Sequence, residues 1–331
     1  MSERASEPVP QGRWTRGEIE VVRAAVRAAP SVHNTQPWVL EFHDDAHGAS
    51  LFQRLDRVLP RHDPLGRDQL ISCGAAVENL VLAMRILGWE PELELLPNRT
   101  RRDEVAVVRA RTRRSPSEVD LDRYAAVSRR HSHRQPFAAM PVSPTDLRRL
   151  VSASHTDGVQ TRPVRTDEET AVLAKVFDHA ALVLRADRAY QRELSAWTAP
   201  GPNPAPGEGV ADVPRPLATL PWAGLIRRST RIPDEVTLTA RLSRECLLLV
   251  ETPDDGRLDQ VRAGMAAQAT WLAATAAGLV GSILTQPFHL AEVRAGLIEG
   301  LFLAGFPQAL LRFGHPTSEH AASRGRTEED S

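Results

Sequence analysis

The chain has only two cysteines and a single lysine among its 331 residues, and both shortages exclude classes of site. Cys73 and Cys246 stand alone in apolar segments, with no C-x-x-C motif and no Cys/His pairing at metal-ligand spacing. That distribution argues against a disulfide framework and against a zinc site built on cysteine. Because Lys175 is the only lysine, no second lysine exists for Schiff-base or phosphate chemistry.

The chain also lacks an excess of charge of either sign. Lysine and arginine together number 41 and the acidic residues 42, so the formal net charge at pH 7 is −1. Such a chain has no overall positive electrostatic potential to attract nucleic acid or an anionic membrane, and we expect neither as a partner. Met1 to Arg4 carry charges and no apolar run follows them, so we expect no secretory signal and a cytoplasmic protein.

One long segment, from Ala263 to Ala291, contains no Asp, Glu, Lys or Arg and is long enough to span a bilayer. It is dominated by Ala, Gly and Thr, contains two glutamines, and is interrupted at Gly278, Gly281 and Pro287. This pattern favours a buried core helix followed by a strand over a membrane span.

The chain repeats itself at an offset of 190 residues. The segment from Leu70 to Gly88 matches the segment from Gln260 to Gly278, including a glycine near the start of each and another at the end. We therefore predict two copies of one long helix, each with a terminal glycine as its C-cap. A short strand is expected after each helix, at Val105–Ala110 and at Gln308–Phe313.

A short amphipathic helix is also expected in each half, at Glu18–Ala29 and at Thr145–Ser154. The first helix should stop at Pro30, and a strand should run from Trp38 to Phe42. The residues between them include several neutral hydrogen-bonding side chains, Ser31, Asn34 and Gln36. Such groups suit the edges of a flat heterocycle, although they are also ordinary turn residues. The corresponding segment of the second half, 155–160, has lost this pattern.

Between the halves, Arg130, Ser132 and Arg134 alternate, so an extended backbone would direct all three side chains to one side. Two guanidinium groups and a hydroxyl facing one way form a phosphate or carboxylate site, and the alternative is a solvated basic turn. His131 and His133 lie nearby, but no third ligand accompanies them at metal-binding spacing, so we expect no metal site.

These two segments resemble parts of one protein family. The motif A-P-S-x-x-N-x-Q-P-W after a helix resembles the flavin loop of the nitroreductase family, and its histidine before Asn34 resembles the Acg branch. The motif R-x-S-x-R resembles the signature that opens nitroreductase domains. The resemblance implies that FMN is contacted through its isoalloxazine and ribityl parts by Ser31, Asn34 and Gln36, and through its phosphate by Arg130, Ser132 and Arg134.

Further candidates for FMN binding come from the second half. The stretch from Gly278 to Ser282 resembles the G-L-G-S turn of the family with one residue inserted, which implies cofactor contacts for Gly281, Ser282 and Gln286. Arg312 stands where the family often has a basic residue near the phosphate. Pro287 departs from the family, which often has a glycine there whose N–H can reach flavin N5, and proline has no N–H.

Each repeat thus keeps one half of a flavin site, and typical nitroreductases are homodimers with FMN at the subunit interface. The resemblance therefore implies an α+β, nitroreductase-like fold in which two tandem repeats form an intramolecular pseudo-dimer with one FMN. We place the first repeat at 1–127, the second at 128–320 and a disordered tail at 321–331. Association of pseudo-dimers with one another stays open.

The proline-rich stretch from Trp197 to Trp222 cannot be helix or central strand. Its apolar flanks favour a partly ordered lid, an insertion at about 190–235, and the alternative is a disordered surface loop. The functional hypothesis is an FMN-dependent oxidoreductase that reduces a nitroaromatic, a quinone or an unknown metabolite with electrons from NAD(P)H or another donor.

No catalytic acid, base or nucleophile is expected, since the flavin would carry the electrons. The lid and Pro287 favour an alternative, a protein that sequesters or stores FMN with little NAD(P)H-dependent turnover. No G-x-G-x-x-G follows a strand, but nitroreductases do without one. A third alternative, a structural or interaction repeat without cofactor, would leave Arg130, Ser132 and Arg134 unexplained.

Overall fold

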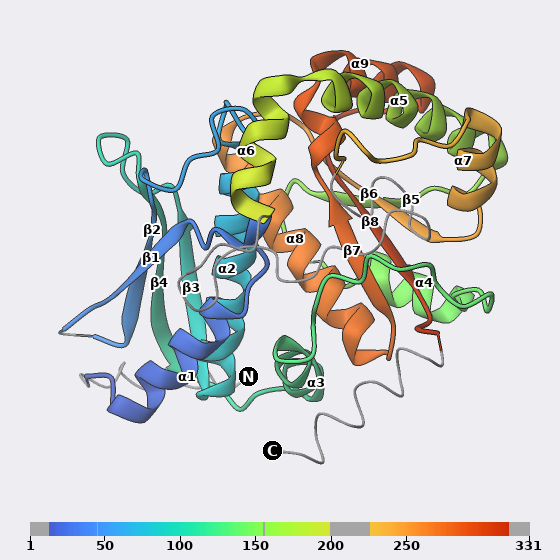
Figure 1. Cartoon of the computed structure of the whole chain (residues 1–331). Coiled ribbons are helices and arrows are strands. Elements are labelled where there is room, and N and C mark those ends of the chain that lie inside the picture. The colour runs from blue at the N-terminus through green and yellow to red at the C-terminus, as the bar shows by residue number, and fades with distance from the viewer. Residues whose placement is uncertain (1–12, 45, 155, 199–225, 318–331) are drawn as a thin grey trace, which may run out of the picture.

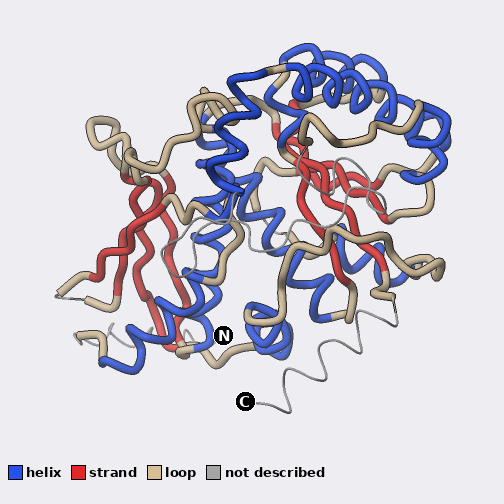
Figure 2. Tube along the Cα trace, viewed as in Figure 1, coloured by secondary structure: helices blue, strands red, loops and turns tan. Residues whose placement is uncertain are grey.

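The computed structural model describes residues 13–44, 46–154, 156–198 and 226–317. These residues form two four-stranded sheets with helices between and around them (Figure 1). Figure 2 shows the strands as two separate groups on either side of a pair of helices. Every strand pair is antiparallel, so the predicted α+β class with mostly antiparallel sheets is confirmed, and the two sheets fit a tandem pseudo-dimer.

The first sheet has the strand order β1-β2-β4-β3. Its strands are β1 (Trp38–Phe42), β2 (Gly48–Gln53), β3 (Trp89–Leu95) and β4 (Glu104–Arg113). Helices α1 (Arg16–Arg27) and α2 (Arg67–Ile86) bury their apolar side chains against it. Both strands predicted for this half, at Trp38–Phe42 and Val105–Ala110, are present. The helix predicted at Glu18–Ala29 is also present, but it spans Arg16–Arg27 and ends before Ala29.

The second sheet repeats this order as β5-β6-β8-β7. Its strands are β5 (Gln160–Pro163), β6 (Cys246–Thr252), β7 (Val280–Leu284) and β8 (Phe306–Gly314). Successive residues of β6 pack on opposite faces, because Leu247 and Leu249 join one apolar cluster and Leu248 and Val250 another. Helices α5 (Asp167–Ala186), α7 (Glu235–Leu242) and α9 (Ala291–Gly300) contribute to the first cluster, and α4 (Pro144–Val151) and α8 (Arg257–Ala276) to the second.

Helices α2 and α8 are the repeated long helices, and they pack against each other between the sheets (Figure 1). Each has 20 residues, and their first residues and last residues are both 190 positions apart. Gly88 and Gly278 follow them with φ of +82° and +78°, a left-handed conformation that suits the predicted C-cap role. The uncharged segment Ala263–Ala291 is therefore the core helix followed by a strand that its sequence predicts.

The remaining α-helices of the described residues are α3 (Glu118–Val127) and α6 (Arg188–Thr198). Helix α3 packs against both α2 and α8. The expected insertion lies between β5 and β6, where the structure describes α6 before 199 and α7 after 225. The proline-rich part of the predicted lid, 199–225, lies outside the described residues, as does the predicted tail. Within the described ranges only α2 is long and apolar enough to cross a membrane, and 89% of its apolar window is buried.

Candidate functional site

The loop from Pro30 to Pro37 has an unusual backbone. His33, Asn34 and Gln36 all have positive φ, at +47°, +56° and +45°, in the left-handed region that non-glycine residues rarely adopt. Ser31 Oγ accepts a hydrogen bond from the Gln36 backbone N–H at 3.0 Å, which closes the loop on itself. Val32 N–H donates to Ser72 Oγ on α2 at 3.1 Å, which ties the loop to the long helix. Backbone strain of this kind is concentrated at functional sites in proteins.

The segment that contains Arg130, Ser132 and Arg134, called the arginine segment below, runs beside β7, an edge strand of the second sheet. Ser132 forms a parallel bridge with Gly281, and His133 N–H donates to the Gly281 carbonyl at 2.7 Å. Gly281 has no room for a side chain, since a Cβ there would lie 2.3 Å from the Phe313 ring. The segment is therefore held against β7 by backbone contacts, and Ser132 and Arg134 reach the cavity described next.

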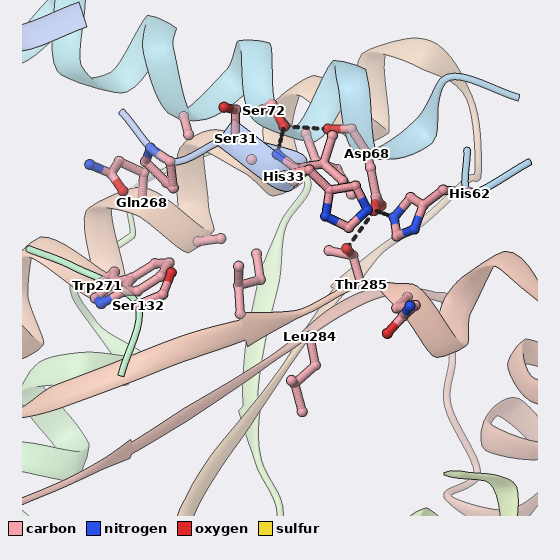
Figure 3. A pocket seen from close by; sticks show the side chains of 18 of the residues that line it. Ser31, His33, His62, Asp68, Ser72, Ser132, Gln268, Trp271, Leu284 and Thr285 are labelled. Atoms are coloured by element: carbon pink, nitrogen blue, oxygen red, sulfur yellow. Dashed lines mark hydrogen bonds and ion pairs between the residues drawn. The ribbon is translucent and has the colours of Figure 1, made fainter. Parts of the chain in front are cut away.

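A cavity with an empty volume of about 850 Å³, partly open to solvent, lies between the two halves (Figure 3). Residues of both halves line it, from the strained loop, α2, the arginine segment, α8 and the end of β7. Ala75, Gly264 and Ala267 give one wall small side chains, which leaves space for a flat group. Of the predicted site residues, the cavity lining includes Ser31, Ser132, Arg134 and Gln286.

The other predicted site residues are not part of this lining. Asn34 and Gln36 belong to the strained loop and follow Ser31 and His33 in the sequence. Arg130 instead supports the site, because its guanidinium donates to the Ala28 carbonyl at 3.2 Å and lies 4.6 Å from the centroid of the Trp271 ring. Burial lowers the pKa of Arg130 to about 10. Ser282 is buried, and its Oγ has no partner among the described residues.

Arg312 lies behind the arginine segment, in the core of the second half. Its Nε and Nη2 donate to the two carboxylate oxygens of Glu245, each at 2.6 Å. Its Nη1 donates to the His133 carbonyl at 3.2 Å, and its guanidinium lies over the Phe137 ring. The contacts of this arginine thus position residues 133–137, while its charge is balanced by Glu245.

Sequence reasoning missed a buried polar cluster at one end of the cavity. His62 Nε2 and His289 Nε2 each lie 3.0 Å from Asp68 Oδ2, and Thr285 donates to the same oxygen at 2.6 Å. The ring of His33 lies 4.6 Å from that of His62, centroid to centroid, and Figure 3 shows both rings beside the Asp68 carboxylate. No sequence signal marks this cluster, because its members come from separate elements of both halves.

The cluster places the Asp68 carboxylate and neighbouring histidine rings together in the protein interior. Burial lowers the pKa of His33 well below its usual range, and the neighbouring His62 lowers it further. Burial acts to raise the pKa of Asp68, but His289 and His62 outweigh it and hold that pKa well below its usual range. Asp68 is therefore a carboxylate surrounded by imidazoles.

A second cavity is lined by other residues of α2 and α8, together with residues of β3 and α3. Eight lining residues of one cavity and eight of the other are related by the same 190-residue offset. The pairs, each with the residue of the first cavity named first, are Asp68 and Leu258, Ser72 and Arg262, Ala75 and Met265, Gln268 and Glu78, Trp271 and Val81, Ile283 and Leu93, Leu284 and Glu94, and Thr285 and Leu95. The second cavity thus occupies the repeat-related position but has different chemistry, including a buried Glu78 and an arginine in place of Ser72.

Comparison with known proteins identifies relatives over most of the chain. A Mycobacterium tuberculosis protein whose name assigns it to the NAD(P)H nitroreductases is 33% identical over 305 residues, 89% of this chain and 83% of that protein. Another protein of that organism, named NAD(P)H nitroreductase Acg, is 31% identical over 313 residues, 89% of each chain. No family model matches. Among solved structures, an FMN-dependent nitroreductase of Mycobacterium smegmatis in complex with NADPH gives a TM-score of 0.38 at 15% identity, over 63% of this chain and 93% of that one.

Proposed function

The chain belongs to the nitroreductase family, and from this premise we propose that it binds one FMN in the cavity between its two repeats and works as a flavin-dependent oxidoreductase. The observation that carries the proposal is the lining of that cavity. The strained loop of the first half and the arginine segment of the second half meet there, at Ser31 on one side and at Ser132 and Arg134 on the other. A single chain thereby supplies what a dimer interface would supply.

The residues present fit a flat, anionic cofactor. The wall of small residues on α2 and α8 leaves room for a flat ring system. Gln286 Nε2 is buried without a hydrogen-bond partner among the described residues, so it can donate a hydrogen bond to a bound ligand. Arg134 places a cation at the cavity, which suits a phosphate or the anionic edge of a reduced ring.

When bound, FMN supplies the electron-transfer chemistry. The chain's own residues then have two tasks. Ser31, Gln286 and the loop that contains Ser31 orient the ring through hydrogen bonds, and Ser132 and Arg134 hold the anionic part. We infer that NAD(P)H is the donor and that the acceptor is a small organic molecule, a nitroaromatic or a quinone.

The contacts of α6 favour a second candidate function, retention of FMN with little turnover. Glu193 on α6 accepts hydrogen bonds from the backbone N–H groups of Arg61 and His62, the latter at 2.7 Å, and Tyr190 stacks on the His62 ring. Helix α6 is therefore held against His62, which lines the cavity. We infer that a helix held in this way slows exchange of donor and acceptor.

The purified protein, reconstituted with FMN if necessary, should show a bound-flavin visible spectrum. Oxidoreductase activity predicts that anaerobic NADPH bleaches this spectrum and that a quinone or nitroaromatic restores it. Retention without turnover predicts bleaching by dithionite and none by NADPH or NADH. Failure to bind flavin at all would contradict both functions.

A further inference from the structure

We propose that His62, Asp68 and His289 bind a first-row transition-metal dication such as Zn²⁺. Their ligand atoms all lie within 4.8 Å of one another, and within the described residues these three alone meet that test as a set. Two imidazoles and one carboxylate form a donor set that such ions take in proteins, with further coordination positions left open. This inference is independent of the flavin, because it rests on the side chains of the cluster and their surroundings and not on the cofactor.

The spacing of the ligand atoms suits a metal ion. Bonds of about 2.0–2.1 Å in a tetrahedral shell place neighbouring ligand atoms roughly 3.3 Å apart. His62 Nε2 and His289 Nε2 each lie 3.0 Å from Asp68 Oδ2, close to that separation. A small relaxation of the carboxylate would open the site to an ion.

The surroundings of the three side chains favour a cation. Thr285 donates to Asp68 Oδ2 at 2.6 Å, and Asp63 Oδ1 lies 3.8 Å from His289 Nδ1. The Asp63 carboxylate forms no hydrogen bond to the ring at this distance, but its negative charge would stabilise an ion bound nearby. Glu193 holds the backbone of His62 from α6, so the loop that carries this ligand is itself anchored.

A second observation points to a ligand in this cluster. His33 is only 7% exposed, and its Nε2 has no hydrogen-bond partner in the part of the chain that the structure describes. Its ring lies beside His62 and the Asp68 carboxylate (Figure 3). A buried polar atom without a partner is costly, and a bound ion or its water would satisfy it.

The position of the cluster decides what the ion can contact. His62 and Asp68 both line the main cavity, whereas His289 approaches from η2 (Gln286–His289) behind it. An ion among them would therefore have its open coordination position toward the cavity. Small molecules with a carbonyl or nitro oxygen are the class of ligand that this position would take.

The test is metal binding by the full-length protein. Chelator-treated protein should bind one equivalent of Zn²⁺ in calorimetry, and one equivalent of Co²⁺ should give the intense visible absorption of a four-coordinate ion. His62→Ala and His289→Ala should each weaken binding at least about 100-fold, while His179→Ala should not, because His179 pairs with Glu292 at the exposed surface.

Circular dichroism of each variant separates loss of binding from loss of folding, and the wild-type titration decides the question even if a variant does not fold. Absence of stoichiometric binding to the wild type would overturn the proposal and leave a hydrogen-bonded cluster. Binding that keeps its affinity in both folded cluster variants would overturn it too, since the ion would then lie elsewhere.

Discussion

Gly74 of α2 and Gly264 of α8 lie against each other where the two long helices cross. A Cβ placed on Gly74 would lie 3.1 Å from Gly264 Cα and only 2.0 Å from the carbonyl oxygen of Val261. A Cβ on Gly264 would lie equally close to the carbonyl oxygen of Ile71. The obstacles are backbone atoms on both sides, so neither helix can yield locally. This crossing sets the separation of the two repeats and hence the width of the cavity that they share.

We expect Gly264→Ala to destabilise the protein by about 3 kcal/mol, because overpacking against backbone forces the helices apart. Urea unfolding followed by circular dichroism measures this change. The matched control is Gly17→Ala in α1, where nothing lies within 4 Å of the added carbon. That variant should gain up to about 1 kcal/mol from helix propensity. Equal effects of the two substitutions would contradict a close crossing.

The pair of Arg312 and Glu245 supports the arginine segment from behind, and both side chains are almost completely buried. Glu245→Gln should lower the free energy of unfolding by about 3 kcal/mol, because it leaves a buried guanidinium without its counter-charge. Glu92→Gln serves as the control, since Glu92 pairs with Arg111 at the exposed edge of the first sheet. The control should cost less than about 1 kcal/mol. A Glu245→Gln variant as stable as the control would show that the buried pair contributes little.

Glu78 gives the stability a dependence on pH. Burial raises the pKa of Glu78, nearby Asp120 adds to the increase, and Arg85 and Arg123 oppose it. The folded state therefore holds the proton more tightly than the unfolded state. Stability is lost as pH rises through the unfolded pKa of about 4.3 toward the higher folded value, and each unit of difference is worth about 1.4 kcal/mol.

Glu78→Gln should therefore be more stable than the wild type at pH 7, and this gain should vanish near pH 4. Urea unfolding at a series of pH values measures the difference. Glu20→Gln, at an exposed position of α1, should show no such trend. A gain from Glu78→Gln that did not depend on pH would reject ionisation as its cause.

Sequence patterns predicted the elements whose signal is local. The two long helices, their terminal glycines and the strands after them follow from periodicity and from the 190-residue repeat. Pro30 marked the end of α1, and the alternation of Arg130, Ser132 and Arg134 indicated a segment facing a ligand. The assignment of these residues to FMN stays a prediction.

The rest depends on contacts between distant parts of the chain. Alternation implied that Arg130 and Arg134 both face the ligand. The guanidinium of Arg130 instead donates to the Ala28 carbonyl and stacks on the Trp271 ring, and both residues are distant from it in the sequence. Arg312 meets Glu245 only because β8 pairs with β6. The cluster of His62, Asp68 and His289 brings together three segments with no motif among them, so only the folded structure reveals it.

Equilibrium titration of flavin-free protein with FMN shows whether the chain holds a single flavin between its repeats. We expect one FMN per chain. Arg134→Ala should raise the Kd at least about tenfold through loss of a charge-assisted contact. Arg262→Ala, in the repeat-related second cavity, should leave both the stoichiometry and the Kd unchanged. No binding, two equivalents per chain, or a Kd that responds to Arg262→Ala and not to Arg134→Ala would contradict a single flavin site between the repeats.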